Sequence, residues 1–268
     1  MSKSDDLAGI LRVAVDAANL GASIAEQSFT KLVDTQIEAK AGSINLVTEI
    51  DRTVESAITD RVKRAYPGHD ILGEELGGVE PGDVEHAWLI DPIDGTTNYI
   101  HGMPHYAVSV AYAVRGEVQV GACLDVSRKE TFTAIRGNGA YLNGHAIHSA
   151  ATGSLNSALI ITGFYYERGE IMEKTLDSIR SLFGAGIRGI RRSGSAVLDL
   201  CWVASGRVDG FFEYRLSPWD YAAAGLVARE AGAQTFDPYG QPLALTSDGV
   251  ICGTAGIAQS FVDLVSMS

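Results

Sequence analysis

Three features are scarce in this chain of 268 residues, and each scarcity excludes a class of protein. Cysteine occurs only at Cys123, Cys201 and Cys252, and no Cys-x-x-Cys spacing is present, so neither a disulfide framework nor a cysteine zinc site is expected. No run approaches the ~20 apolar residues that span a bilayer. The N-terminus lacks the basic-then-apolar layout of a signal peptide. These absences predict a cytoplasmic protein with reduced cysteines.

Basic residues are also in short supply. The chain has 21 Lys and Arg against 33 Asp and Glu, which gives a net charge of −12. Because binding to a phosphate backbone needs a basic surface, nucleic acid is not expected as a partner. An acidic protein that acts on a phosphorylated molecule needs a bound divalent metal to reverse the local field. The alternative is that the acidic residues only keep the surface soluble.

The pattern of predicted elements divides the chain into two parts. Residues 1–148 are expected to form two helices and a largely antiparallel sheet, and residues 149–268 alternate strands and helices in the manner of an α/β unit. The join lies in a Ser- and Ala-rich stretch at residues 145–155. A composition that is 46% hydrophobic is sufficient for a substantial core.

Periodicity predicts the N-terminal helices. Apolar positions from Leu7 to Phe29 recur at helical spacing, and a second helix is expected to begin near Thr48 and to end at residues 66–68. Asp51 falls in the first turn of this second helix, where the simplest interpretation is a partner for the helix dipole. A short strand at residues 71–75 then ends in two acids.

The stretch 88–98 (Trp-Leu-Ile-Asp-Pro-Ile-Asp-Gly-Thr-Thr-Asn) is the most informative part of the sequence. Its apolar start predicts a buried strand that breaks at Asp-Pro. Asp91 and Asp94, at the strand end, can point at one place, and carboxylate oxygens are ligands that Mg²⁺ prefers. The Gly-Thr-Thr at residues 95–97 offers N–H and hydroxyl donors to an anion. On spacing alone, an ordinary Asx turn stays an alternative.

Two further segments carry candidate polar groups. Asp220 falls in the first turn of a helix that is expected to start at Pro218, and a plain capping role is the alternative there. Residues 191–196 (Arg-Arg-Ser-Gly-Ser-Ala) form a strand–glycine–helix junction that can present amides and a guanidinium, or that is simply a helix start. Glu74, like Asp220, lies at the end of a predicted element, where α/β proteins tend to place their sites.

Five elements of the sequence together form a recognisable pattern. They are the Thr-x-x-Asp of residues 48–51, the Gly-Glu-Glu of 73–75, the stretch 88–99, the junction 191–196 and the Trp-Asp-Tyr-Ala-Ala of 219–223. In this order and spacing, over nearly the whole chain, the sequence resembles the inositol monophosphatase family, and the junction resembles its bacterial members in particular.

This resemblance implies an α/β (α+β) fold, the layered αβαβα sandwich of the sugar-phosphatase type, and a homodimer. It implies a lithium-sensitive phosphomonoesterase that uses two or three Mg²⁺ ions per active site. One ion would be held by Glu74, Asp91 and the backbone carbonyl of Ile93. A second would be held by Asp91, Asp94 and Asp220, and Glu74 would contribute to a third, weaker site.

The resemblance also assigns the remaining roles. Thr96 would orient the attacking water with Asp51 behind it as a hydrogen-bond partner, and Glu74 would complete the catalytic group. The phosphate would rest on the amides of Gly95 and Thr96. The residues that would meet the substrate hydroxyls are Asp94, Arg191, Gly194, Ser195, Ala196 and Glu213. His101 and His105 are expected to be loop or packing residues.

The expected substrate is inositol 1-phosphate or a similar polyol phosphate. The same chemistry on fructose 1,6-bisphosphate, histidinol phosphate or a nucleotide 3′-phosphate is the nearest alternative. A partner-binding protein that keeps the fold without catalysis is a more distant one, against which the retained carboxylates argue. Residues 163–166 (Gly-Phe-Tyr-Tyr) depart from the Gly-Phe-Pro of many bacterial relatives, so they leave the sugar selectivity open.

Overall fold

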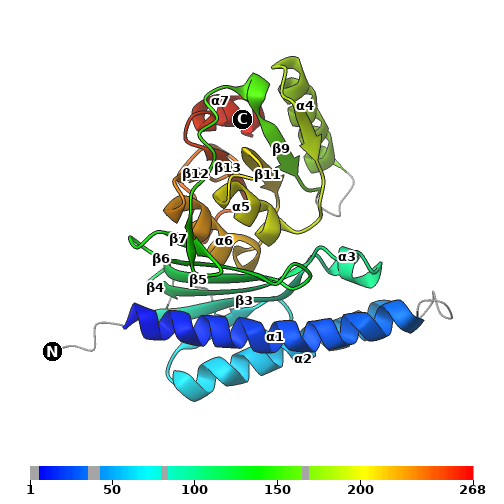
Figure 1. Ribbon diagram of the computed structural model, residues 1–268, viewed down its shortest axis with the longest axis vertical. Coiled ribbons are helices and arrows are strands. Elements are labelled where there is room, and N and C mark those ends of the chain that lie inside the picture. The colour runs from blue at the N-terminus through cyan, green and yellow to red at the C-terminus, as the bar shows by residue number, and fades with distance from the viewer. Residues whose placement is uncertain (1–5, 36–42, 80–83, 165–168, 268) are drawn as a thin grey trace.

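The computed structural model describes residues 6–35, 43–79, 84–164 and 169–267, with side chains described outside residues 30–35 and 43–48. Its helices and strands form five layers (Figure 1). Two helices cover the outer face of a large sheet, two helices lie between this sheet and a smaller one, and two more cover the smaller sheet. The predicted αβαβα sandwich is therefore confirmed.

Within the described residues, the large sheet has eight strands. In spatial order they are β2 (Gly77–Gly78), β1 (Asp70–Gly73), β3 (His86–Asp94), β4 (Ala107–Val114), β5 (Glu117–Asp125), β6 (Glu130–Ile135), β7 (Ala140–Leu142) and β8 (His145–Ile147). All neighbours are antiparallel except β1 and β3, which run parallel. The sheet is thus largely antiparallel, as the sequence predicts.

Strand β3 corrects one prediction. It does not break at Asp91-Pro92 but continues to Asp94, with an irregular register against β4 between Asp91 and Asp94. A proline at such an irregularity is tolerated because it has no N–H to contribute to the ladder. The consequence for the site is that both aspartates remain on a strand buried at the centre of the sheet.

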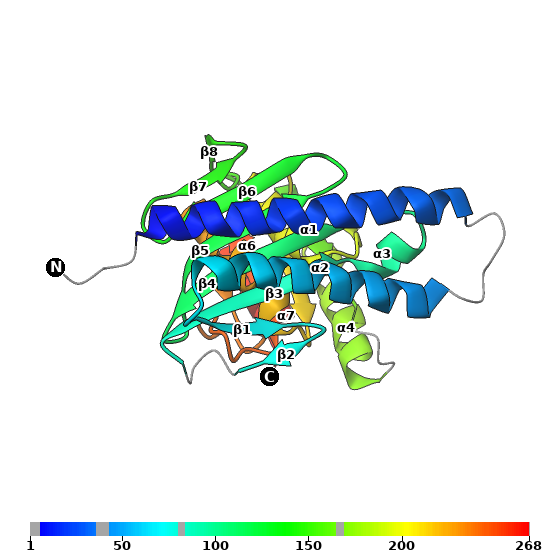
Figure 2. The same ribbon diagram turned by 90° about the horizontal axis from the view of Figure 1, so that it is seen from below.

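Helices α1 (Leu7–Thr35) and α2 (Ser43–Ala65) lie side by side across the outer face of the large sheet (Figure 2). Helix α2 begins earlier than the predicted start near Thr48, whose side chain lies outside the described residues. The two helices approach closely at Gly21, where an added Cβ would lie 2.7 Å from Cδ1 of Ile58. Small residues therefore bring α1 and α2 together.

One described helix bears on the prediction that nothing in the chain spans a membrane. Within α1, the segment Leu7–Phe29 is long and apolar enough to cross a bilayer by length and composition alone. In the structure, its alanines at 14, 17, 18 and 25 are buried in a cluster with residues of α2 and the large sheet. This burial accounts for the apolar character of the helix by packing.

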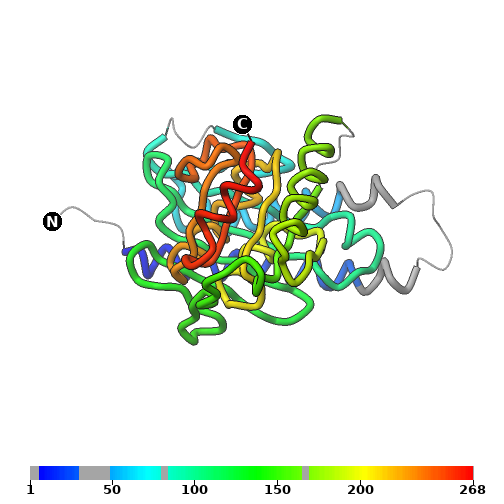
Figure 3. Tube along the Cα trace, turned by 90° about the horizontal axis from the view of Figure 1, so that it is seen from above, coloured from blue at the N-terminus to red at the C-terminus, as the bar shows by residue number. Residues whose placement is uncertain are grey.

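The smaller sheet has the order β10 (Gly189–Arg191), β9 (Leu159–Thr162), β11 (Gly210–Tyr214), β13 (Gly249–Thr254) and β12 (Ala233–Phe236). Its pairing is mixed, because the first three strands run parallel and the last two join antiparallel. Helices α4 (Glu170–Gly184) and α7 (Ala258–Val265) lie together on its outer face (Figure 3). The short 3₁₀ turn Leu155–Ser157 precedes β9.

Helices α5 (Ala196–Ala204) and α6 (Pro218–Glu230) fill the space between the sheets. Helix α6 packs directly on β5, since an added Cβ at Gly121 would lie 2.6 Å from the carbonyl oxygen of Ala223. One buried cluster contains Leu89 and Phe132 of the large sheet together with Val197 and residues of α6. The two predicted parts, 1–148 and 149–268, thus share a core, and their division into domains stays a prediction.

Candidate active site

One cavity of about 310 Å³ lies where the large sheet, α5 and α6 meet. It is lined from the turn after β1, the end of β3, the start of helix α3 (Thr96–Ile100), the junction before α5, the end of β11 and the first turn of α6. The predicted site residues that line it are Glu74, Asp91, Ile93, Asp94, Gly95, Thr96, Gly194, Ala196, Glu213 and Asp220. Segments far apart in the sequence therefore meet in one place.

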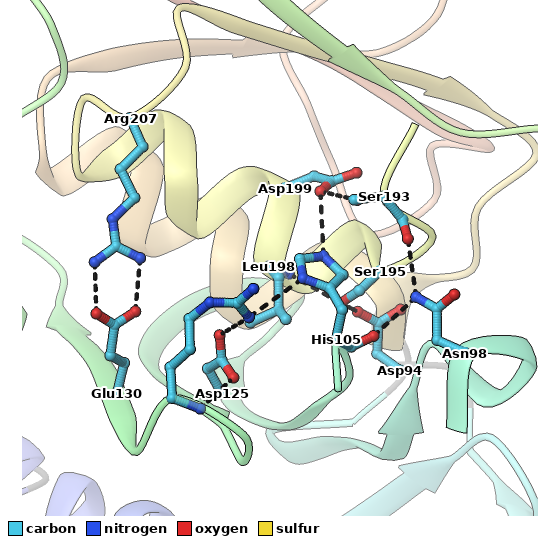
Figure 4. Close-up of polar contacts among 11 residues, drawn as sticks. Asp94, Asn98, His105, Asp125, Glu130, Ser193, Ser195, Leu198, Asp199 and Arg207 are labelled. Atoms are coloured by element: carbon cyan, nitrogen blue, oxygen red, sulfur yellow. Dashed lines mark hydrogen bonds and ion pairs between the residues drawn. The ribbon is translucent and has the colours of Figure 1, made fainter. Parts of the chain in front are cut away.

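Asp94 is fixed by the N-terminus of α5 (Figure 4). Its carboxylate accepts hydrogen bonds from the hydroxyl of Ser195, from the amide of Ala196 at 3.2 Å and from the amide of Val197 at 2.9 Å. Amides at the start of a helix favour a negative charge. Ser195 does not itself line the cavity, so its role in this structure is to hold Asp94.

Asp91 is only 1% exposed, and its Oδ1 atom has no hydrogen-bond partner. A buried carboxylate oxygen without a donor carries an uncompensated desolvation cost. The side chain is therefore in an environment that suits either a proton or a cation. No other carboxylate oxygen that lines the described cavity is buried without a partner in this way.

Glu74 and Asp220 reach the cavity from different elements. Glu74 directly follows β1, and its amide donates to the carbonyl of Ile90 at 3.3 Å. Asp220 accepts a hydrogen bond from the amide of Ser217 at 2.7 Å, which is half of a capping box for α6. Asp220 therefore has the capping role that the sequence left open, and it lines the cavity as well.

Without a bound cation, the carboxylates of Glu74, Asp91, Asp94 and Asp220 are in an electrostatically unfavourable environment. Burial raises the pKa of Asp94 and of Asp220 from 3.8 to about 7. Glu74 is exposed toward the open cavity, yet enough protein surrounds its carboxyl to raise its pKa from 4.5 to about 7. The pKa of Asp91 is raised well above 3.8, first by burial and then by the charges of Glu74, Asp94 and Asp220. The cavity thus disfavours negative charge unless a cation compensates it.

The donor set fits Mg²⁺, although the described residues are not arranged around an ion. Among them, no group of three or more His, Cys, Asp or Glu converges closely enough to hold a metal. The ligands available are oxygens only, as Mg²⁺ prefers. The unpartnered oxygen of Asp91 and the mutual repulsion of the four carboxylates are both features that a divalent cation would relieve.

Thr96 and Asp51 occupy different surroundings. The hydroxyl of Thr96 donates to the carbonyl oxygen of Ile93 at 3.0 Å. Asp51 is 3% exposed on α2 and does not line the cavity. Burial, followed by the charge of Glu75, raises the pKa of Asp51 to about 7. The predicted hydrogen bond between Thr96 and Asp51 is absent from the hydrogen bonds of the described residues and stays a prediction for the ion-bound site.

Gly95 shows why the turn into α3 needs a glycine. Its φ is 96°, in the left-handed region, and an added Cβ would lie 3.1 Å from the carbonyl oxygens of Gly194 and His105. A side chain at this position would therefore have a strained backbone conformation and would crowd these two backbone segments. Gly95 and Thr96 both line the cavity, and the role of their amides in binding a phosphate stays a prediction.

The junction before α5 is tied to the loop before β4. Asn98 donates to the carbonyl oxygens of His105 and Ser193, at 2.8 Å each (Figure 4). Ser193 donates to Asp199, and Nε2 of His105 lies 3.9 Å from the same carboxylate. His105 is 8% exposed, so it packs inside this network as the sequence predicts. The network holds the segment that binds Asp94.

Of the two adjacent arginines, Arg192 lines the cavity, whereas the predicted Arg191 does not. Arg191 is exposed and donates to the carbonyl of Ile190 at 3.0 Å. Sequence reasoning also missed Arg215 and Leu216, for which the only signal is their position between a strand and a helix. Tyr165 and Tyr166 of the departing segment lie outside the described residues.

Gly163 sets the position of Glu213. Burial raises the pKa of Glu213 to about 8, and the charges of Asp199, Asp94 and Asp220 add to this effect. An added Cβ at Gly163 would lie 1.8 Å from Oε2 of Glu213. The glycine therefore leaves room for the carboxyl group at the cavity wall.

Replacement of Gly163 by alanine is expected to displace Glu213 and to raise KM for the substrate by roughly tenfold, the effect of losing about one hydrogen bond. The obstructing atoms are the end of a flexible side chain, so the protein should stay folded. Steady-state kinetics measure the KM of Gly163→Ala and of a control variant, Gly153→Ala. At Gly153 an added Cβ meets nothing within 4 Å. An unchanged KM in Gly163→Ala would contradict the prediction that Glu213 contacts the substrate.

Comparisons with known proteins identify the family of the chain. The family model described as "Inositol monophosphatase family" matches residues 6–266. The Nus factor SuhB of Escherichia coli is 36% identical over 253 residues, which covers 94% of each chain. The Nus factor SuhB of Pseudomonas aeruginosa is 40% identical over 248 residues, which covers 91% of each.

Solved structures show the same fold. An inositol monophosphatase from Anabaena (Nostoc) matches with a TM-score of 0.83 and 31% identity, over 97% of this chain and 96% of that one. The extragenic suppressor protein suhB from Bartonella henselae matches with a TM-score of 0.85 and 32% identity, over 96% and 98%. On these grounds, the chain belongs to the inositol monophosphatase family.

Proposed function

We propose that this protein is a Mg²⁺-dependent phosphatase that hydrolyses inositol 1-phosphate or a similar polyol phosphate. The observation that carries the proposal is that Glu74, Asp91, Asp94 and Asp220, from four separate segments, line one cavity. Family membership supports phosphatase activity independently of this geometry. The choice of metal and of substrate is the proposed part.

The chemistry explains why an acidic cavity suits this reaction. Phosphate monoesters hydrolyse so slowly without a catalyst that a very large reduction of the barrier is required. Glu74, Asp91 and the carbonyl of Ile93 would hold one Mg²⁺, and Asp91, Asp94 and Asp220 a second, with Glu74 contributing to a weaker third. Bound Mg²⁺ supplies neutralisation of the phosphate charge and acidification of a water molecule.

The chain's own groups position the reactants. The amides of Gly95 and Thr96 would hold the phosphate, and the hydroxyl of Thr96 would orient the water with Asp51 as its partner. A buried Asp51 with a pKa of about 7 can exchange a proton near neutral pH. No cysteine or histidine nucleophile is needed, because this displacement depends on positioning and charge neutralisation.

The other polar groups at the cavity would determine how the alcohol part of the substrate binds. Asp94, Glu213 and the segment Gly194–Ala196 would meet the hydroxyls. Arg192 and Arg215 line the same cavity and bring positive charge to it. A polyol with several hydroxyls offers donors and acceptors for this largely polar wall, which is why we prefer it to an apolar phosphate ester.

A panel of phosphate esters, assayed with and without Mg²⁺, tests the proposed function. We expect phosphate release from inositol 1-phosphate that stops after chelation, resumes with Mg²⁺, and is inhibited by lithium in the millimolar range. A preference for histidinol phosphate, fructose 1,6-bisphosphate or a nucleotide 3′-phosphate would reject the proposed substrate but not the proposed Mg²⁺-dependent hydrolysis. If no ester were hydrolysed at saturating Mg²⁺, the proposal would be rejected.

A second candidate function is the binding of a macromolecular partner. It is favoured by the name Nus factor, which several curated relatives carry. The net charge of −12 favours a protein rather than nucleic acid as that partner.

We also propose a cytoplasmic location, which three buried free cysteines support. We further propose a homodimer, and light scattering is the test of this oligomeric state.

A further inference from the structure

Glu55 is a buried acid that no motif in the sequence singles out. It lies on α2, one turn after Asp51, and it is completely buried. Its Oε2 accepts the amide N–H of Glu75 at 2.8 Å, and its Oε1 accepts the amide N–H of Leu76 at 3.1 Å. A buried carboxylate is tolerated when it is paired in this way. Glu55 thus ties α2 to the turn that follows β1.

This turn carries Glu74. The amide of Glu74 donates to Ile90 of β3, and the next two amides along the chain donate to Glu55. Three consecutive amides are therefore held, the first by the sheet and the other two by Glu55. The backbone of Glu74 has little freedom while both anchors are in place.

Gly73 provides a second observation on the same contact. An added Cβ at this position would lie 1.8 Å from Oε1 of Glu55 and 2.4 Å from its Cδ. The φ of Gly73 is not in the positive range, so the glycine is required by this close approach and not by the backbone conformation. Glu55 can thus reach the turn that carries Glu74 only because position 73 has no side chain.

We propose that Glu55 is a positioning residue, which holds the turn after β1 so that the Glu74 carboxylate faces Asp91 and thereby sets the affinity of their shared site for Mg²⁺. The inference rests on the proposed function, because it takes Glu74 as a metal ligand. Glutamine at position 55 keeps the volume but presents an NH₂ group to a backbone N–H, and two donors repel each other. Loss of such a supporting group typically costs about 10- to 100-fold in metal affinity.

Glu230 offers a matched control for a purely structural role. Its two carboxylate oxygens accept the amides of Gly137 and Gly139 at 2.8 and 2.9 Å, in the turn between β6 and β7. This is the same arrangement of one carboxylate across two turn amides, but neither Glu230 nor its turn lines the cavity. Glu230→Gln should therefore lose comparable turn stability without any effect on the metal.

The experiment measures Mg²⁺ binding by calorimetry to the full chain as wild type, Glu55→Gln and Glu230→Gln. We expect Glu55→Gln to bind Mg²⁺ roughly tenfold or more weakly, and to need correspondingly more Mg²⁺ for half-maximal phosphate release. Glu230→Gln is expected to bind as wild type does. Gly73→Ala, which pushes Glu55 aside without removing its charge, should reproduce the weakened binding and serves if Glu55→Gln does not fold.

The outcomes separate the inference from the function on which it rests. Wild-type affinity in folded Glu55→Gln or Gly73→Ala would overturn the positioning role and leave the proposed phosphatase intact. Equal weakening in Glu230→Gln would also overturn it, because the effect would then be one of general stability. Absence of Mg²⁺ binding by the wild type would overturn the proposed function and the inference together.

Discussion

Replacement of Asp91 by asparagine is expected to lower kcat by on the order of 10³-fold, the upper end of what removal of one preorganised electrostatic group costs. Asp91 is the carboxylate assigned to both proposed principal metal sites, and it is the most deeply buried of the five carboxylates that line the cavity. Asparagine keeps the shape but cannot supply the negative charge that two adjacent cations require. Phosphate release from inositol 1-phosphate at saturating Mg²⁺ measures the effect.

The same substitution should leave the metal-free protein as stable as before, or more stable. It removes a buried charge whose Oδ1 has no partner, so no existing hydrogen bond of that atom is lost. Asp209→Asn is the control, because Asp209 is also buried and accepts the amide of Leu159 at 2.7 Å but does not line the cavity. Near-normal turnover in Asp91→Asn, or a loss equal to that in Asp209→Asn, would contradict the assignment.

The metal-free protein is expected to lose stability as the pH rises from about 4 to about 8. The pKa values of Asp51, Asp94 and Asp220 are raised to about 7, and that of Glu213 to about 8, in each case mainly by burial. A carboxyl whose pKa is raised on folding contributes its stability fully below its ordinary pKa, and this contribution is lost as the pH passes its folded pKa. The change of stability with pH therefore has the opposite sign to that caused by a salt-bridged aspartate, whose contribution is lost as the pH falls.

Thermal unfolding in a chelating buffer measures this effect. One unit of pKa shift corresponds to about 1.4 kcal/mol, so these four acids together should cost several kcal/mol, or roughly 10 °C in Tm for a chain of this size. Mg²⁺ added at the alkaline end should restore most of the loss, and should restore much less in Asp91→Asn. A Tm that is independent of both pH and Mg²⁺ in this range would show that the carboxylates do not interact as described.

Most of the fold follows from local sequence patterns. Periodicity located α1, the expected helix start at Pro218 is the first residue of α6, and the predicted alternation of strands and helices after residue 149 is observed. Helix α3 and strand β2 were not predicted, because α3 has five residues and β2 has two, too few to establish a period. The parallel pairing of β1 with β3 also escaped, since pairing partners depend on contacts that no local pattern encodes.

The site was predictable to the extent that its residues belong to contiguous motifs. Spacing alone left Asp220 as a possible cap and Asp51 as a dipole partner, and only the combination of five motifs placed them with Glu74 and Asp91. The residues that support the site were not predictable in the same way. Glu55 is an ordinary polar position on an amphipathic helix until the turn after β1 is folded against it.

The arginines illustrate the same limit. Arg191 and Arg192 are adjacent, and no pattern in the sequence decides which of them faces the ligand. The short strand β10 ends at Arg191, so the chain leaves the sheet there and places Arg192 at the cavity. A side chain whose direction depends on where a strand ends needs the structure to be assigned.

Anomalous diffraction from crystals grown with Mn²⁺ in place of Mg²⁺ tests the central claim most directly. The account predicts at least one strong peak in the cavity, within coordination distance of Asp91 and of at least two of Glu74, Asp94 and Asp220. Saturating Mn²⁺ with no peak among these carboxylates, or with peaks only on the outer surface, would contradict it.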